Sequence, residues 1–193
     1  MTPGILLKAS EFLIQPLEAF KKSREDETQS VTRYYITFLL VNAVLTDLVS
    51  LMGLGILGLI RRTSFLHHPL IIFFLILLGG ILGAPLLSVW LHLWVYIVGG
   101  RKGFSHTFKA VMYGSTPVLL FSWIPFIGII FYFWSMVLTI FGVHELQEID
   151  GDQAAFAVIV ASIIVVVILV LLMAHLFLTG VFTSMPLART GFL

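Results

Sequence analysis

The chain has 193 residues, of which 59% are hydrophobic and only 11% are charged. Soluble domains carry about 25% charged residues, so much of the surface of this chain must face lipid instead of water. A net charge of +1 argues against a nucleic-acid partner, and the absence of cysteine excludes disulfides and thiolate metal sites. The composition therefore predicts an all-α, polytopic membrane helix bundle.

The first 33 residues, 1–33, precede the first long apolar stretch and are predicted to form a separate segment. Their apolar residues recur every three or four positions: Ile5, Leu6, Ala9, Phe12, Leu13, Leu17 and Phe20. This spacing predicts an N-terminal amphipathic helix, which Pro16 either interrupts or divides by beginning a second helix. The apolar stripe is expected either in the membrane interface or against the ends of the other helices, because both locations would bury the same face.

Residues 34–187 form the predicted membrane domain, and residues 188–193 form a short tail. About 20 apolar residues cross the hydrocarbon core of a bilayer. Three stretches are long enough for one span each: Tyr34–Ile60, Leu70–Val98 and Ala154–Phe182.

A fourth apolar region covers residues 105–143 and is too long for a single span. Its middle holds Ser122-Trp123-Ile124-Pro125, and the proline disfavours helix at the residue before it, which predicts a turn. Two transmembrane helices in this region give five in total. A re-entrant hairpin, which would leave three full spans, stays open as the alternative.

The basic residues predict the orientation of the chain, because Lys and Arg are enriched in cytoplasmic loops. With five spans, eight of the 11 basic residues lie on the side of the N-terminus and three on the other. The N-terminus is therefore expected in the cytoplasm and the C-terminus on the opposite side. Arg101, Lys102 and Lys109 lie in or near the glycine-rich loop Gly99–Gly103 and are expected to contact lipid head groups.

Asp47 is the most conspicuous polar residue, because it lies at the midpoint of the expected span Tyr34–Ile60. A carboxylate at the centre of a bilayer costs at least about 2.5 kcal/mol, which makes it a candidate proton or ion site. Asn42, Thr46 and Ser50 accompany it at helical spacing, which makes a polar stripe. His92 lies on another span, but at a different expected depth. The alternative interpretation of Asp47 is structural, as a hydrogen-bonding group that joins two helices.

The segment His144-Glu145-Leu146-Gln147-Glu148 begins like a zincin motif but has Glu148 where the second histidine is required. His144 and Glu148 could share a metal ion, yet two ligands leave half of the coordination sphere empty. We therefore expect a polar loop, with no metal, no cofactor and no catalytic residue.

Gly79 and Gly83 are spaced as in the G-x-x-x-G pattern that allows two membrane helices to approach closely. The sequence leaves open whether the contact is within one chain or between chains, as in a homo- or hetero-oligomer.

The order of several short motifs resembles the Yip family of Ypt/Rab-interacting membrane proteins, especially its short prokaryotic members. The motifs are Pro16–Phe20, Gly99–Ser105, Tyr113–Pro117, Gly142–Leu146 and Ala154–Ala157, and the resemblance covers about residues 12 to 175. It implies five spans, a cytoplasmic N-terminus and no catalytic residues. It also implies links to small GTPases, vesicle traffic and membrane shaping, although only 33 residues precede Tyr34, fewer than in eukaryotic members.

The leading functional hypothesis is a non-enzymatic membrane adaptor or organiser. The alternative is a small-solute or ion transporter, proton-coupled through Asp47, and a membrane enzyme is third. A water-filled cavity that reaches Asp47 would favour the transporter.

Overall fold

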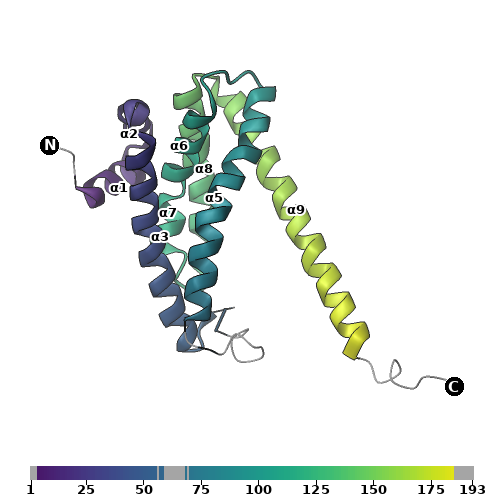
Figure 1. The fold of residues 1–193 in the computed structure, drawn as a ribbon. Coiled ribbons are helices and arrows are strands. Elements are labelled where there is room, and N and C mark those ends of the chain that lie inside the picture. Colours follow the sequence, from purple (N-terminus) through teal and green to yellow (C-terminus); the bar gives the residue numbers. More distant parts are fainter. Residues whose placement is uncertain (1–3, 56, 59–67, 69, 185–193) are drawn as a thin grey trace.

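The computed structural model describes residues 4–55, 57–58, 68 and 70–184, and within these ranges all regular structure is helical (Figure 1). The predicted all-α fold is thereby confirmed. Four helices have the length and apolar composition needed to cross a membrane: α3, α5, α8 and most of α9. The predicted tail, residues 188–193, lies outside the described residues.

The N-terminal segment folds into two short helices, α1 (Ile5–Ile14) and α2 (Pro16–Lys22), followed by the 3-10 turn η1 (Ser23–Glu25). Pro16 lies in the first turn of α2, where a missing N–H costs no helical hydrogen bond, so it begins a second helix. Three residues of the stripe, Ala9, Phe12 and Phe20, belong to the same apolar core as the long helices, so this part of the stripe packs on the bundle, whereas Leu6 is 76% exposed.

Helix α3 (Thr28–Leu51) ends well before the expected limit at Ile60. The chain turns at Gly53, whose φ of +78° is a backbone conformation that favours glycine. The Gly53 N–H donates to the Ser50 carbonyl over 3.0 Å and the Leu54 N–H to the Val49 carbonyl over 3.2 Å, the pattern of a Schellman cap. The prediction that Asp47 lies at mid-span was therefore wrong, because it lies in the last turns of α3.

Helix α5 (Ile71–Ile97) matches the expected second span and packs against α3. Gly80 allows a close approach, since a Cβ there would lie 2.4 Å from Cδ1 of Leu39. The Tyr35 hydroxyl donates to the Gly80 carbonyl over 3.2 Å. A Cβ at Gly79 or Gly83 would meet no other atom within 4 Å, so these two glycines leave an open face.

The region expected to hold two spans contains α6 (Phe104–Gly114), α7 (Thr116–Phe121) and α8 (Gly128–Gln147). The predicted turn is present between α7 and α8. Pro117 has no N–H to donate to the Tyr113 carbonyl, which instead accepts the Thr116 hydroxyl at 2.6 Å. This exchange explains the break between α6 and α7.

Helices α6 and α7 run beside α8 in the opposite direction (Figure 1). Gly114 makes this close packing possible, since a Cβ there would lie 3.0 Å from the backbone N and Cα of Thr139. α8 is long enough by itself to cross a membrane. This length counts against a re-entrant hairpin, which would consist of two half-length helices.

The last helix, α9 (Gly151–Ser184), packs on α5 and α8 near its start and then diverges from the bundle (Figure 1). Trp90 of α5 donates its indole N–H to the Ala161 carbonyl over 3.1 Å. Beyond this contact the described side chains of α9 are largely exposed, as expected of a helix surrounded by lipid.

Candidate functional site

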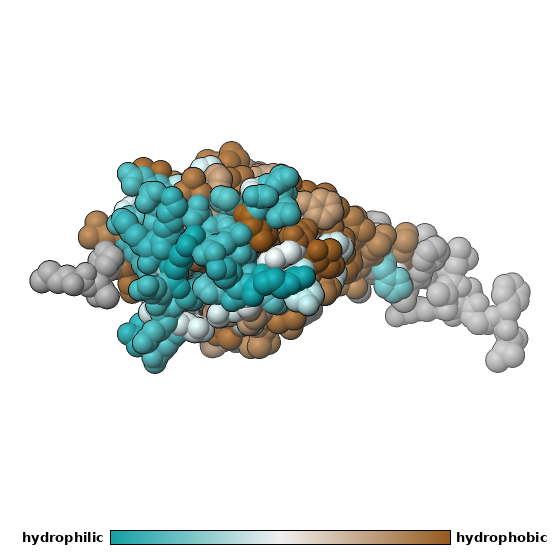
Figure 2. Space-filling view, turned by 90° about the horizontal axis from the view of Figure 1, so that it is seen from above, coloured by the Kyte–Doolittle hydropathy of each residue, from teal (hydrophilic) through white to brown (hydrophobic). Residues whose placement is uncertain are grey.

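Hydrophilic side chains gather at one end of the bundle, shown from above in Figure 2. We call this the polar end. It consists of α2 and η1, the α5–α6 turn (residues 98–103) and the α8–α9 turn (residues 148–150). The sides of the bundle are apolar, so most charged groups of the described residues are concentrated where a membrane would give way to water.

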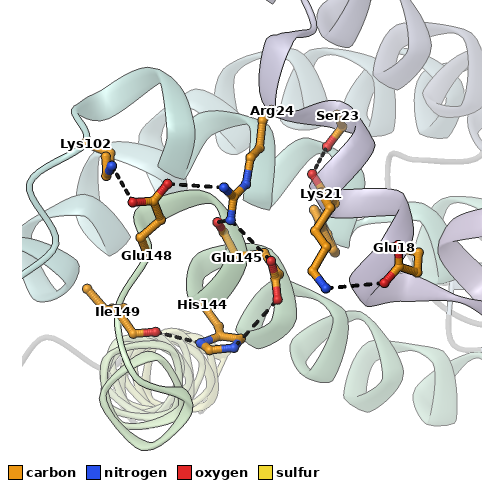
Figure 3. Close-up of polar contacts among 10 residues, drawn as sticks. Glu18, Lys21, Ser23, Arg24, Lys102, His144, Glu145, Glu148 and Ile149 are labelled. Atoms are coloured by element: carbon orange, nitrogen blue, oxygen red, sulfur yellow. Dashed lines mark hydrogen bonds and ion pairs between the residues drawn. The ribbon is translucent and has the colours of Figure 1, made fainter.

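An ion-pair network joins the three parts of the polar end (Figure 3). Arg24 of η1 lies 3.3 Å from an oxygen of Glu145 and 3.2 Å from an oxygen of Glu148. It also donates to the Glu145 backbone carbonyl over 2.8 Å. Lys102 of the α5–α6 turn pairs with the other oxygen of Glu148. One carboxylate thus links the N-terminal segment to a turn about 80 residues later.

Glu148 can occupy this central position because it caps α8 in a left-handed conformation, with φ of 52°. The hydrogen bond from Lys102 is the main cause that holds the pKa of Glu148 below its usual range, and the charge of Arg24 acts in the same direction. The side chain is 45% exposed, so the network is weakened by solvent and salt.

Gln147 supports the network from beneath and is only 2% exposed. Its amide N–H group donates over 2.9 Å to both the Gly103 carbonyl and the Thr107 hydroxyl. Its amide oxygen accepts the Lys102 backbone N–H at 3.1 Å. Sequence reasoning missed Gln147, although a glutamine at the end of an apolar helix is a recognisable candidate for such a cap.

The candidate histidines belong to separate local contacts. A ring nitrogen of His92 lies 2.8 Å from the Thr107 hydroxyl, so this residue joins α5 to α6. The Nδ1 atom of His144 lies 2.6 Å from the Ile149 carbonyl oxygen, and its Nε2 atom lies 3.7 Å from a carboxylate oxygen of Glu145 (Figure 3). Glu148 makes its contacts with Arg24 and Lys102 instead. Among the described residues no cluster of three or more potential metal ligands occurs.

The three expected head-group residues occupy different environments. Lys109 is 6% exposed and donates to the Arg24 carbonyl over 2.7 Å, so its ammonium group lies inside the protein. Lys102 pairs with Glu148, and the guanidinium of Arg101 lies 3.8 Å from the ring centre of Tyr96. Arg101 and Lys102 are exposed and continue as predicted head-group contacts.

An aromatic cluster beneath α2 holds the N-terminal segment in place. Phe12 is fully buried, stacked on Tyr113 at 4.4 Å between ring centres and edge-on to Phe20 at 4.9 Å. The Tyr113 hydroxyl donates to Asp26 over 2.6 Å, and Lys8 contacts both partners, at 2.6 Å from Asp26 and 2.8 Å from Tyr113. The spacing of the stripe predicted that Phe12 is buried, but it did not predict that Tyr113 would be the ring on which Phe12 stacks.

The residues of the polar stripe of α3 lie in two separate environments. The Asn42 amide donates to the Leu119 carbonyl over 3.0 Å and to the Ser122 hydroxyl over 2.8 Å, which satisfies the end of α7. Asp47 is 4% exposed. A cavity of about 570 Å³ nearby is lined by its neighbours Thr46 and Ser50, and Asp47 is not among the lining residues.

Comparison with known protein families gives one match. The Yip1 domain model matches residues 10–174. The chain belongs to the Yip1 domain family. The match begins in the middle of α1 and ends in α9, so α2, the polar end and most of the bundle lie inside the Yip1 domain. No curated protein and no solved structure matches the chain.

Proposed function

We propose that this Yip1-domain protein is a non-enzymatic membrane organiser that presents its polar end to a protein partner. The observation that carries the proposal is the network of Arg24, Glu148 and Lys102, which joins three distant segments into one surface. The charged groups of these three residues are paired with one another, as in a binding surface of defined shape. Family resemblance makes a small GTPase the first partner class to test.

In the proposed topology the chain crosses the membrane five times, with α6 and α7 together forming the third crossing. The side of the membrane that holds the polar end then carries eight of the 11 basic residues, which favours a cytoplasmic location for the polar end and the N-terminus. The C-terminus lies on the opposite side. The open face at Gly79 and Gly83 is the surface that we propose for self-association within the membrane.

A site-specific crosslinking experiment tests the organiser function. A photo-crosslinking amino acid replaces Glu18, whose side chain on α2 is 61% exposed, and the control replaces Ile130, an exposed residue on α8 far from the polar end. In native membranes we expect protein adducts from position 18 and lipid adducts from position 130. The adducts from position 18 should weaken when Arg24→Ala breaks the network. Position 18 giving no protein adduct above the level of position 130 would refute the proposal.

A further inference from the structure

The side chains of α1 are arranged in the opposite way to those of a helix on a water-facing surface. Its most exposed residues are apolar: Leu6 is 76% exposed, Leu7 64% and Ile14 76%. Its two charged residues are less exposed than these, since the side chain of Lys8 is 23% exposed and that of Glu11 is 39% exposed. In water a helix turns its charges outward and its apolar stripe inward. α1 therefore has two apolar faces, one against the bundle and one facing outward.

The charges of α1 are also neutralised within the chain. Lys8 pairs with Asp26 at 2.6 Å and lies 4.7 Å from the ring centre of Tyr113. Glu11 lies 3.7 Å from the ammonium of Lys22. Pairing of this kind is what a charged residue requires in order to stay in a medium of low dielectric constant.

Contacts of α1 place it below the polar end and not on top of it. α1 touches α7, and Figure 1 shows it beside α3 and beneath α2. The ring of Phe12 packs on Tyr34, which lies about 9 Å along α3 from Thr28 by helical rise. Phe12 also stacks on Tyr113, next to Gly114, and Gly114 packs on Thr139, about 12 Å along α8 from Gln147. By both estimates α1 lies about 10 Å from the polar end, measured along the axes of the long apolar helices.

We propose that α1 is embedded in one leaflet of the bilayer, with Ile5, Leu6, Leu7 and Ile14 against phospholipid acyl chains. Lipid is the occupant that fits, because α1 lies beside long helices whose own outer surface is apolar, as at the exposed Leu40, Val41 and Val44 of α3. The embedded helix adds a cylinder about 10 Å wide and about 15 Å long to the leaflet at the polar end. The protein thereby occupies more area in that leaflet than the long helices alone would. The proposal holds for either orientation of the chain, and the proposed topology makes this leaflet the cytoplasmic one.

Fluorescence quenching tests the proposal, since the chain has no cysteine and single cysteines can be placed freely. Leu7→Cys carries an environment-sensitive fluorophore on α1, and Glu18→Cys carries the same label on α2 as the matched control. Each protein is reconstituted in phosphatidylcholine vesicles that contain lipids with a nitroxide on the acyl chain or on the head group. We expect the acyl-chain nitroxide to quench position 7 several-fold more than position 18, and iodide in the buffer to show the reverse order.

Two results would overturn the proposal. One is equal quenching by iodide at positions 7 and 18, which would place α1 in water. The other is efficient disulfide formation between unlabelled Leu7→Cys chains together with weak acyl-chain quenching, which would assign the face to a second copy. Thermal unfolding of Leu7→Cys in detergent checks that the fold is intact, which we expect because the side chain is largely exposed. Partner crosslinking from position 18 is measured separately and can succeed or fail independently.

Discussion

The docking of the N-terminal segment should depend on Phe12 more than on any other residue of α1. The ring is fully buried and contacts three aromatic rings, those of Phe20, Tyr34 and Tyr113. Truncation of a buried phenylalanine to alanine costs about 3–5 kcal/mol, because transfer energy is lost and a cavity remains. At the lower limit the population of undocked segment rises by a factor of about 10², since 1.4 kcal/mol corresponds to a tenfold change.

Limited trypsin digestion measures this population. Lys21 and Lys22 on α2 are exposed, but their peptide bonds are protected by the helix, so cleavage reports undocking and unfolding of the segment. We expect Phe12→Ala to be cleaved there about a hundredfold faster than the wild type, while the long helices stay intact. Ile14→Ala, which removes an apolar side chain that faces away from the bundle on the same helix, is the matched control and should raise the cleavage rate far less than Phe12→Ala does. A cleavage rate of Phe12→Ala within twofold of the control would refute the reasoning.

Four further predictions address topology, packing, pH and Asp47. A membrane-impermeant thiol reagent should label Ser105→Cys and Gln153→Cys from one side and Phe126→Cys, in the α7–α8 turn, from the other; labelling of all three from one side would exclude five crossings. Gly114→Ala should lower the melting temperature through about 1–3 kcal/mol of overpacking against Thr139, and Gly79→Ala should not, because its Cβ meets open space. The pKa of Glu148 is lowered in the folded state, so its contribution to stability is present at neutral pH and is lost as the pH falls through that folded-state pKa; thermal unfolding from pH 7 to 3 should show a part of this loss that Glu148→Gln abolishes. Asp47→Asn should leave the melting temperature within a few degrees of the wild type, and proton flux in liposomes should be the same for both proteins. In a proton-coupled transporter that uses Asp47, the substitution would abolish the flux.

Local signals in the sequence predicted the helices well where the chain is continuously apolar. α5 and the α7–α8 turn agree with expectation because a long apolar run and a proline act within a few residues. The end of α3 was misplaced because Gly53 lies inside an apolar stretch, and hydropathy does not register a glycine that turns the chain. The Met52-Gly53 pair was the available signal, since glycine just after a helix is its commonest stop. The network around Glu148 could not be predicted, because Arg24 and Lys102 come near it only through the packing of whole helices.

The corrected end of α3 changes the comparison between an organiser and a transporter. With Asp47 in the last turns of α3, a transport route would have to run from there along the whole of the bundle to the polar end. Phe38 and Tyr34 lie on that course and are each 3% exposed, and Asn42 between them and Asp47 is committed to the end of α7. Opening such a route would break the aromatic cluster that also holds α1 and α2. A carboxyl group near one end of a span costs less than one at its centre, so its presence requires no transport function to explain it. The same aromatic packing gives the polar end a firm base, which is the property that an organiser requires.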